Sequence, residues 1–166
     1  MSHSGDKKRL SLSLHHSPGS SASKITPYHP AALNLEIESP PMVFYGSTTA
    51  STGALFSGQL KIHVEEENLA IETFKMRMVL EVARKKPFHS GCKECTNQST
   101  DLNTWDFLAG PATFPHGEHT FPFSFLLPGH LPTSMKGALT SIGYVLRATV
   151  NTKSGEVRFS CFVHNP

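Results

Sequence analysis

The sequence contains few cysteines, few charged residues and no long apolar run. Its three cysteines are an odd and sparse set, which favours a reducing compartment over a disulfide-stabilised secreted domain. Charged residues make up 17% of the chain and the formal net charge is +2, so composition gives no sign of nucleic-acid binding. No apolar run approaches the roughly 18 residues needed to span a membrane, and the amino terminus has no signal-peptide core. We therefore expect a soluble intracellular protein with no nucleic-acid partner and no transmembrane segment.

The common catalytic motifs are missing as well. The chain has no Gly-x-Ser-x-Gly, no phosphate loop and no His-Glu-x-x-His, the patterns that position nucleophiles, phosphates and zinc. Its ten histidines are spread along the chain and do not form a complete set of ligands at a recognised spacing. We predict a binding protein that is not an enzyme and needs no cofactor.

Residues 1–30 differ in composition from the rest of the chain. They are rich in Ser, His and Pro and contain almost no aromatic or β-branched residues, so they cannot bury enough apolar surface to offset the entropy lost on ordering. We predict a disordered leader over residues 1–30. Within it, Ser11 and Ser13 follow the basic triplet Lys7–Arg9 and are candidate phosphorylation sites for a basophilic kinase. A solvated tail without such a site is the alternative.

Residues 31–166 show the period-two alternation of apolar and polar side chains that is typical of half-buried strands. Because 12 Gly and 12 Pro punctuate the chain, we predict one all-β domain, a two-sheet antiparallel β-sandwich of the immunoglobulin-like kind. The predicted strands cover residues 33–37, 58–64, 71–83, 121–127, 142–150 and 157–163. The predicted inward-facing residues are Leu35, Ile37, Leu60, Ile62, Phe74, Met76, Met78, Leu80, Phe121, Phe123, Phe125, Tyr144, Leu146 and Phe159.

Two segments interrupt the alternation. Glu65–Glu67 is predicted to be a solvated turn between two strands. Over residues 87–115 the alternation stops altogether, which predicts a long loop that is functional or partly mobile. We expect Trp105, Phe107 and Leu108 to anchor this loop to the sandwich.

Prolines punctuate residues 117–150 in an unusual way. Pro122 cannot donate a hydrogen bond to a ladder, so its strand is expected at a sheet edge or a bulge. Pro128 and Pro132 stop that strand and fix an irregular crossing before the next alternating run.

This punctuation resembles the amino-terminal domain of the arrestin family. The pattern is Phe-x-Phe-x-x-x-Leu-Pro-x-x-Leu-Pro-x-Ser, then Ile-x-Tyr-x-Leu-x-Ala. It is carried by Phe121, Phe123, Leu127, Pro128, Leu131, Pro132, Ser134, Ile142, Tyr144, Leu146 and Ala148. The block CKECTNQSTDLNTWDFL is most similar to fungal α-arrestins, the arrestin-related trafficking adaptors. The resemblance extends roughly from Leu33 to Pro166.

The resemblance implies an adaptor that recognises cytosolic tails of plasma-membrane transporters and links them to a HECT-type ubiquitin ligase for ubiquitination and endocytosis. It implies a cytoplasmic protein that is recruited peripherally to plasma, endosomal and Golgi membranes. The chain has no Pro-Pro-x-Tyr ligand for WW domains, because Val43 holds the tyrosine position after Pro40-Pro41. We therefore expect the ligase contact, and the second sandwich of full arrestins, outside this chain. The alternative is a retromer-like sorting or structural subunit, which shares the fold without recruiting a ligase.

His89, Cys92 and Cys95 form a His-x-x-Cys-x-x-Cys cluster. Two thiolates at this spacing suit tetrahedral zinc, but a structural site needs four ligands and no second pair follows at a regular spacing. A redox role is weakly supported, because no βαβ unit surrounds the pair. We predict two reduced loop thiols without a bound metal, and zinc is the alternative.

The spacing of Cys92, Trp105 and Cys161 is roughly that of the immunoglobulin Cys…Trp…Cys pattern. A secreted adhesion sandwich would join Cys92 to Cys161 by a disulfide. Cys92 lies among loop residues, however, and Phe159 occupies the tyrosine-corner position two residues before the second cysteine. These details argue against the secreted class.

Basic residues gather on the longest predicted strand. Lys75 and Arg77 are two residues apart and so share its outward face. Arg84, Lys85 and Lys86 close its end. Clustered cations make the local electrostatic potential more positive, which favours the binding of carboxylates and phosphates. We predict that these five residues bind the acidic or phosphorylated tail of the cargo, as arrestin amino-terminal domains do; the alternative is that they only keep a sheet face soluble.

Overall fold

The computed structural model describes residues 30–47, 50–87, 92 and 95–163. In this part of the chain the regular elements are antiparallel strands. They are β1 (Ala31–Ile37), β2 (Ala54–Arg84), β3 (Asn97–Asp106), β4 (Ala112–Leu127), β5 (Met135–Lys136), β6 (Thr140–Thr152) and β7 (Gly155–Val163). The predicted all-β fold is confirmed. The predicted leader up to residue 29 lies outside the described residues.

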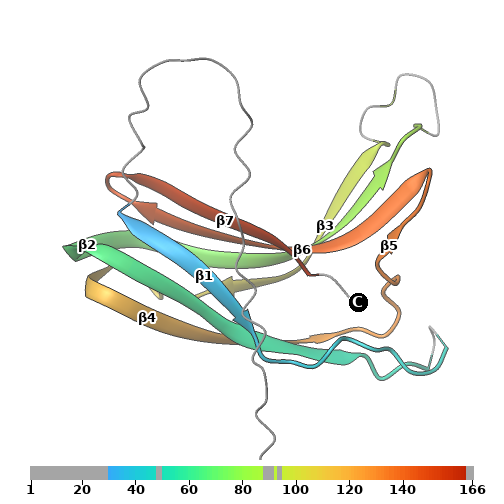
Figure 1. Cartoon of the computed structure of the whole chain (residues 1–166), viewed down its shortest axis with the longest axis horizontal. Helices are drawn as coiled ribbons and strands as arrows, with labels where there is room; N and C mark the ends of the chain where they lie inside the picture. Colours follow the sequence, from blue (N-terminus) through green and yellow to red (C-terminus); the bar gives the residue numbers. More distant parts are fainter. Residues whose placement is uncertain (1–29, 48–49, 88–91, 93–94, 164–166) are drawn as a thin grey trace, which may run out of the picture.

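Strand β2 connects the two layers of the molecule. Its residues 54–71 pair with β4, and residues 58–64 also pair with β1. Its residues 71–84 pair with β6, and residues 75–83 also pair with β3. Figure 1 shows β1, β4 and the first half of β2 in the lower layer, with β6 and β7 in the upper layer. The predicted two-layer antiparallel sandwich is therefore confirmed, and a single hydrogen-bonded network joins its layers.

The predicted turn at Glu65–Glu67 is wrong, because the strand continues through these residues. The pairing of β2 with β4 is irregular here: Val64 pairs with Gly117, and the next pair joins Asn68 to Pro115. Extra residues on one strand bend it and increase its twist. Strands that pass from one sheet to another do so at such bulges. Three consecutive glutamates therefore mark a bend that changes layers, and the chain does not reverse within one sheet.

Alternate apolar side chains of both layers fill the space between them. The predicted inward residues that are buried are Leu60, Ile62, Phe74, Met76, Met78, Phe123, Tyr144 and Leu146. Those that are partly buried against the same core are Leu35, Leu80, Phe121, Phe125 and Phe159. Ile37 is the exception, since it is 41% exposed. It ends strand β1 and lies opposite Gly58, which has no side chain to cover it.

The predicted loop over residues 87–115 is also wrong, because it contains β3 and the start of β4. Strand β3 shows no alternation for two reasons. Most of its side chains are polar and exposed, as expected for an edge strand held by backbone hydrogen bonds to β2. A register shift also leaves Leu102 as an extra residue, since Met78 pairs with Asn103 and Val79 with Asp101. The predicted anchors, Trp105, Phe107 and Leu108, do pack against the core.

The proline-rich crossing after β4 is fixed to the sheet by a tyrosine. The hydroxyl of Tyr144, on β6, donates a hydrogen bond to the Pro132 carbonyl, and burial raises the pKa of this tyrosine. Pro122 is exposed and lies on β4, which pairs only with β2 among the described strands. Its predicted place at a sheet edge is therefore confirmed.

Candidate functional site: the basic end of the sandwich

The five predicted cargo-binding residues divide into two groups. Lys75 and Arg77 project from the outer face of β2, with side chains 51% and 48% exposed. Each has a carboxylate partner on β3: Lys75 Nζ lies 3.1 Å from Asp106, and Arg77 Nη1 lies 3.1 Å from Asp101. Such exposed pairs contribute only about 0–1 kcal/mol to stability, but they lower the positive potential of this face.

Arg84 contacts the beginning of β3. Its guanidinium donates to the Cys95 carbonyl at 3.3 Å and to Gln98 Oε1 at 2.9 Å. Its backbone N–H donates to the Thr96 carbonyl. Arg84 therefore holds the two ends of the 85–96 connection together, and its charge is already engaged by protein oxygens.

Lys85 and Lys86 are exposed at the end of β2. Among the described residues neither forms an ion pair, in contrast to Lys75 and Arg77. The backbone N–H of Lys85 donates to the Leu139 carbonyl at 2.9 Å. This bond places both lysines beside the turn that joins β5 to β6.

The β5–β6 turn adds a third lysine and two apolar side chains. Lys136 pairs with Ser141, and the Gly137 N–H closes the turn on the Thr140 carbonyl at 2.9 Å. Met135 is 50% exposed and Leu139 is 64% exposed. Because β6 separates β5 from β2, Lys136 and the end of β2 are about 10 Å apart, two strand spacings.

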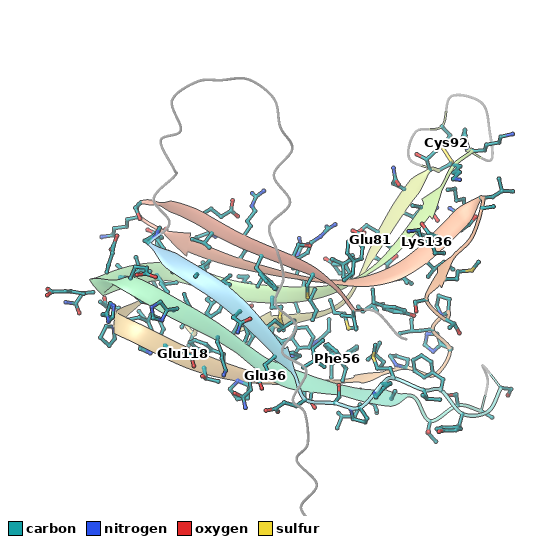
Figure 2. All side chains as sticks on the ribbon, viewed as in Figure 1. Glu36, Phe56, Glu81, Cys92, Glu118 and Lys136 are labelled. Atoms are coloured by element: carbon teal, nitrogen blue, oxygen red, sulfur yellow. A yellow bond between two sulfur atoms is a disulfide. The ribbon has the colours of Figure 1, made fainter. Side chains whose placement is uncertain are left out.

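We call this surface the basic end; its residues are Lys85, Lys86, Met135, Lys136 and Leu139. Beside it lies a hollow of about 600 Å³, at the place where β5 begins and β7 ends along the edge of β6. Met135, Lys136, Ile142, Gly143 and Phe162 line this hollow. Figure 2 shows Lys136 at the same end of the molecule as Cys92, away from Glu118.

The basic end combines two features that suit an extended acidic peptide. Ammonium groups without a described carboxylate partner attract carboxylates and phosphates. The hollow offers apolar surface to a side chain between the acidic positions. The sequence prediction missed Lys136, because a lysine in a two-residue strand has no local pattern that places it beside another strand.

The predicted reduced state of the loop thiols is wrong. Cys92 and Cys95 form a disulfide, with their Cα atoms 5.4 Å apart, inside the range that a disulfide bond requires. Cys161 is a buried free thiol, so the Cys92–Cys161 bond of a secreted sandwich is excluded. The candidate ligand His89 and the candidate phosphorylation sites Ser11 and Ser13 lie outside the described residues.

Comparison with known proteins identifies the architecture. A family model described as LDB19, arrestin N-terminal like, matches residues 74–162, more than half of the chain. Protein LDB19 of Eremothecium gossypii is 39% identical over 76% of this chain and 20% of its own length. The HECT-type ubiquitin ligase-interacting protein apyA of Emericella nidulans is 24% identical over 74% of this chain and 36% of its own length. This chain thus spans only about a fifth to a third of these curated relatives.

A solved structure supports the same fold. The sporulation control protein Spo0M from Bacillus subtilis superposes with a TM-score of 0.56 over 82% of this chain and 48% of its own, at 17% identity. Within the described residues we find no helix of the length and apolarity that crossing a membrane requires.

Proposed function

The chain belongs to the arrestin N-terminal-like family, and on this basis we propose that it is the cargo-recognising module of an arrestin-related adaptor. In this proposal the cargo is the cytosolic tail of a plasma-membrane transporter, which the adaptor selects for ubiquitination and endocytosis. A relative that is named for its interaction with a HECT-type ubiquitin ligase supports this class of adaptor. The module itself performs no catalysis.

The basic end is the observation that carries the proposal. Lys85, Lys86 and Lys136 are exposed and have no ion-pair partner among the described residues, so an incoming carboxylate or phosphate displaces no internal partner. Lys75 and Arg77 already face Asp106 and Asp101. An acidic tail therefore gains less binding free energy from Lys75 and Arg77 than from the basic end. Both groups of residues belong to the proposed cargo surface. Arg84 shapes the surface through its hydrogen bonds to Cys95, Thr96 and Gln98 at the beginning of β3.

Recruitment of the ligase is assigned to regions outside this chain, since no Pro-Pro-x-Tyr motif occurs in it. We propose a cytoplasmic location with peripheral recruitment to plasma, endosomal and Golgi membranes through the cargo. Binding of a synthetic ligase WW domain to this chain alone would contradict the assignment of ligase recruitment to other regions.

A charge-reversal series tests the cargo surface. The probes are acidic transporter-tail peptides and matched peptides in which Gln replaces Glu and Asn replaces Asp. We expect Lys85→Glu with Lys86→Glu to weaken acidic-peptide binding by about tenfold or more, and Lys75→Glu with Arg77→Glu to weaken it less. The salt dependence of binding should flatten in parallel, because ions screen exposed charges over about 8–10 Å at moderate salt.

Lys153→Glu is the matched control, because Lys153 is also exposed but lies in the β6–β7 turn. Melting temperatures test the fold of each variant, and exposed substitutions of this kind should change stability by only about 0.5 kcal/mol per site. If the folded Lys85/Lys86 variant binds every acidic peptide as tightly as the parent protein does, the cargo site lies elsewhere.

A further inference from the structure

Three side chains with metal-binding atoms meet where β2 and β4 bend between the layers. They are His63 and Glu65 on β2 and His116 on β4. The candidate ligand atoms all lie within 4.8 Å of one another. His63 Nε2 is 3.6 Å from Glu65 Oε1, and the two imidazole rings are 5.8 Å apart between centroids.

The bulge explains why residues so far apart in sequence converge. His63 and Glu65 flank Val64, whose side chain is fully buried, so both project from the outer face of β2. Ladder pairing stops at Val64 with Gly117 and resumes at Asn68 with Pro115. His116 thus lies opposite the extra residues of β2, next to Gly117, whose φ of +122° is a conformation that favours glycine.

We propose that His63, Glu65 and His116 form a zinc-binding site. Two imidazoles and one carboxylate are a zinc ligand set when a fourth position is left to water or to a ligand from a partner. Zinc bonds of about 2.0–2.2 Å place tetrahedral ligand atoms roughly 3.4 Å apart. The side chains of His63 and Glu65 are 47% and 53% exposed, so they have space to rotate inward over the remaining distance.

The surrounding charges also favour a cation. Glu66 and Glu67 adjoin the site on β2, and Glu118 pairs with His63 across the ladder. The nearby cation, Lys61, is engaged by Glu36 at 3.1 Å and by Glu118 at 3.7 Å. Imidazole ligands select zinc and its transition-metal neighbours over Ca²⁺ and Mg²⁺, which prefer oxygen.

A bound ion would cross-link β2 and β4 at the point where backbone hydrogen bonds between them are interrupted. It would thereby fix the bend on which the two-layer arrangement depends. The site goes beyond the proposed cargo function: it shares no residue with the basic end and lies near Glu118, at the other end of the molecule in Figure 2.

Isothermal titration of the metal-free chain with ZnCl₂ tests the proposal. Cys92→Ser with Cys95→Ser serves as the parent, since this change prevents reduction of the Cys92–Cys95 disulfide from supplying competing thiol ligands. We expect binding of one zinc ion per chain, and no binding of Ca²⁺ or Mg²⁺. His63→Ala and His116→Ala should each weaken zinc binding by more than about tenfold, because even second-shell partners of a metal typically contribute 10–100-fold.

His130→Ala is the control, because His130 is an exposed loop histidine outside the cluster; it should bind zinc as the parent does. Zinc should also raise the melting temperature of the parent and of His130→Ala, but not that of the other two variants. A parent that binds no zinc overturns the proposal. So does zinc binding that is unchanged in both His63→Ala and His116→Ala, which would assign the metal to other residues.

Discussion

The thiol of Cys161 lies on β7 opposite Leu146 of β6, and the residue is 7% exposed. Burial raises the pKa of this thiol to about 11, and a backbone hydrogen bond from Leu146 offsets part of that shift. The thiolate is the reactive form of cysteine. A buried thiol with so high a pKa is therefore protected from modification by both access and protonation.

We predict that Cys161 resists a thiol reagent such as DTNB in the native protein at pH 8. Denaturation without reductant should expose one reactive thiol, and denaturation after reduction should expose three, since Cys92 and Cys95 form the disulfide. Rapid labelling of the native protein would contradict the burial of Cys161. Three reactive thiols in denatured, unreduced protein would contradict the disulfide.

The same pKa predicts a loss of stability at alkaline pH. The unfolded thiol ionises near 9 and the folded thiol near 11, so the unfolded state releases its proton first. The stabilising contribution is complete below pH 9 and is lost as the pH rises through 11, by about 3 kcal/mol in total. Urea denaturation over this range should show a shallower decline for Cys161→Ala than for the parent. If the stability of both proteins declines equally with pH, ionisation of the Cys161 thiol does not control the pH dependence.

At the scale of the element, β2 depends on a glycine where three strands lie side by side. Gly58 pairs with Ile37 of β1 and with Phe123 of β4. A Cβ atom at this position would lie 2.3 Å from the Glu36 carbonyl oxygen and 2.9 Å from Phe123 Cζ. Backbone on one side and a packed aromatic ring on the other leave no room for a methyl group.

We predict that Gly58→Ala lowers the free energy of unfolding by about 1–3 kcal/mol, the usual cost of overpacking a core. Gly110→Ala is the matched control, because a Cβ atom there would meet nothing within 4 Å; it should be neutral or slightly stabilising. Chemical denaturation of both variants measures the difference. Equal stability of the two would show that β1 and β4 move apart easily at this point.

At the scale of the whole molecule, aromatic side chains connect the layers that β2 joins. Phe74 is 1% exposed and packs against Phe107 at 5.0 Å and Phe121 at 4.9 Å between ring centroids. Trp105, the single tryptophan, packs against Phe123 at 5.4 Å and donates from Nε1 to the Ser124 carbonyl at 3.1 Å. The fluorescence of Trp105 therefore reports on the contact of β3 with β4.

We predict that the two layers unfold together, because β2 belongs to both. Phe74→Ala should cost about 3–5 kcal/mol and shift the midpoints of tryptophan fluorescence and far-UV circular dichroism by the same amount. Phe162→Ala is the control, since Phe162 is 61% exposed and should shift both midpoints far less. Separate midpoints for the two probes in the parent would show that the layers unfold independently.

The properties that depend on local repetition could be predicted from the sequence alone. Alternation along a strand places successive side chains on opposite faces, so it was sufficient to predict the buried positions of β2 and β6. It failed at Ile37 and in β3, where a missing cross-strand side chain and a bulge change the outcome without changing the local pattern. The spacing of the prolines is also a local pattern, and the family resemblance that rests on it is confirmed.

Which side chains of different strands meet could be learned only from the three-dimensional fold. The partners of Lys75 and Arg77 on β3, the approach of Lys136 to the end of β2, and the meeting of His63 with His116 all depend on strand pairing. A shift of one residue in such a pairing moves every side chain to the other face. Register between distant strands is fixed by the packing of the whole core, so these sites have no signature in any one segment of the sequence.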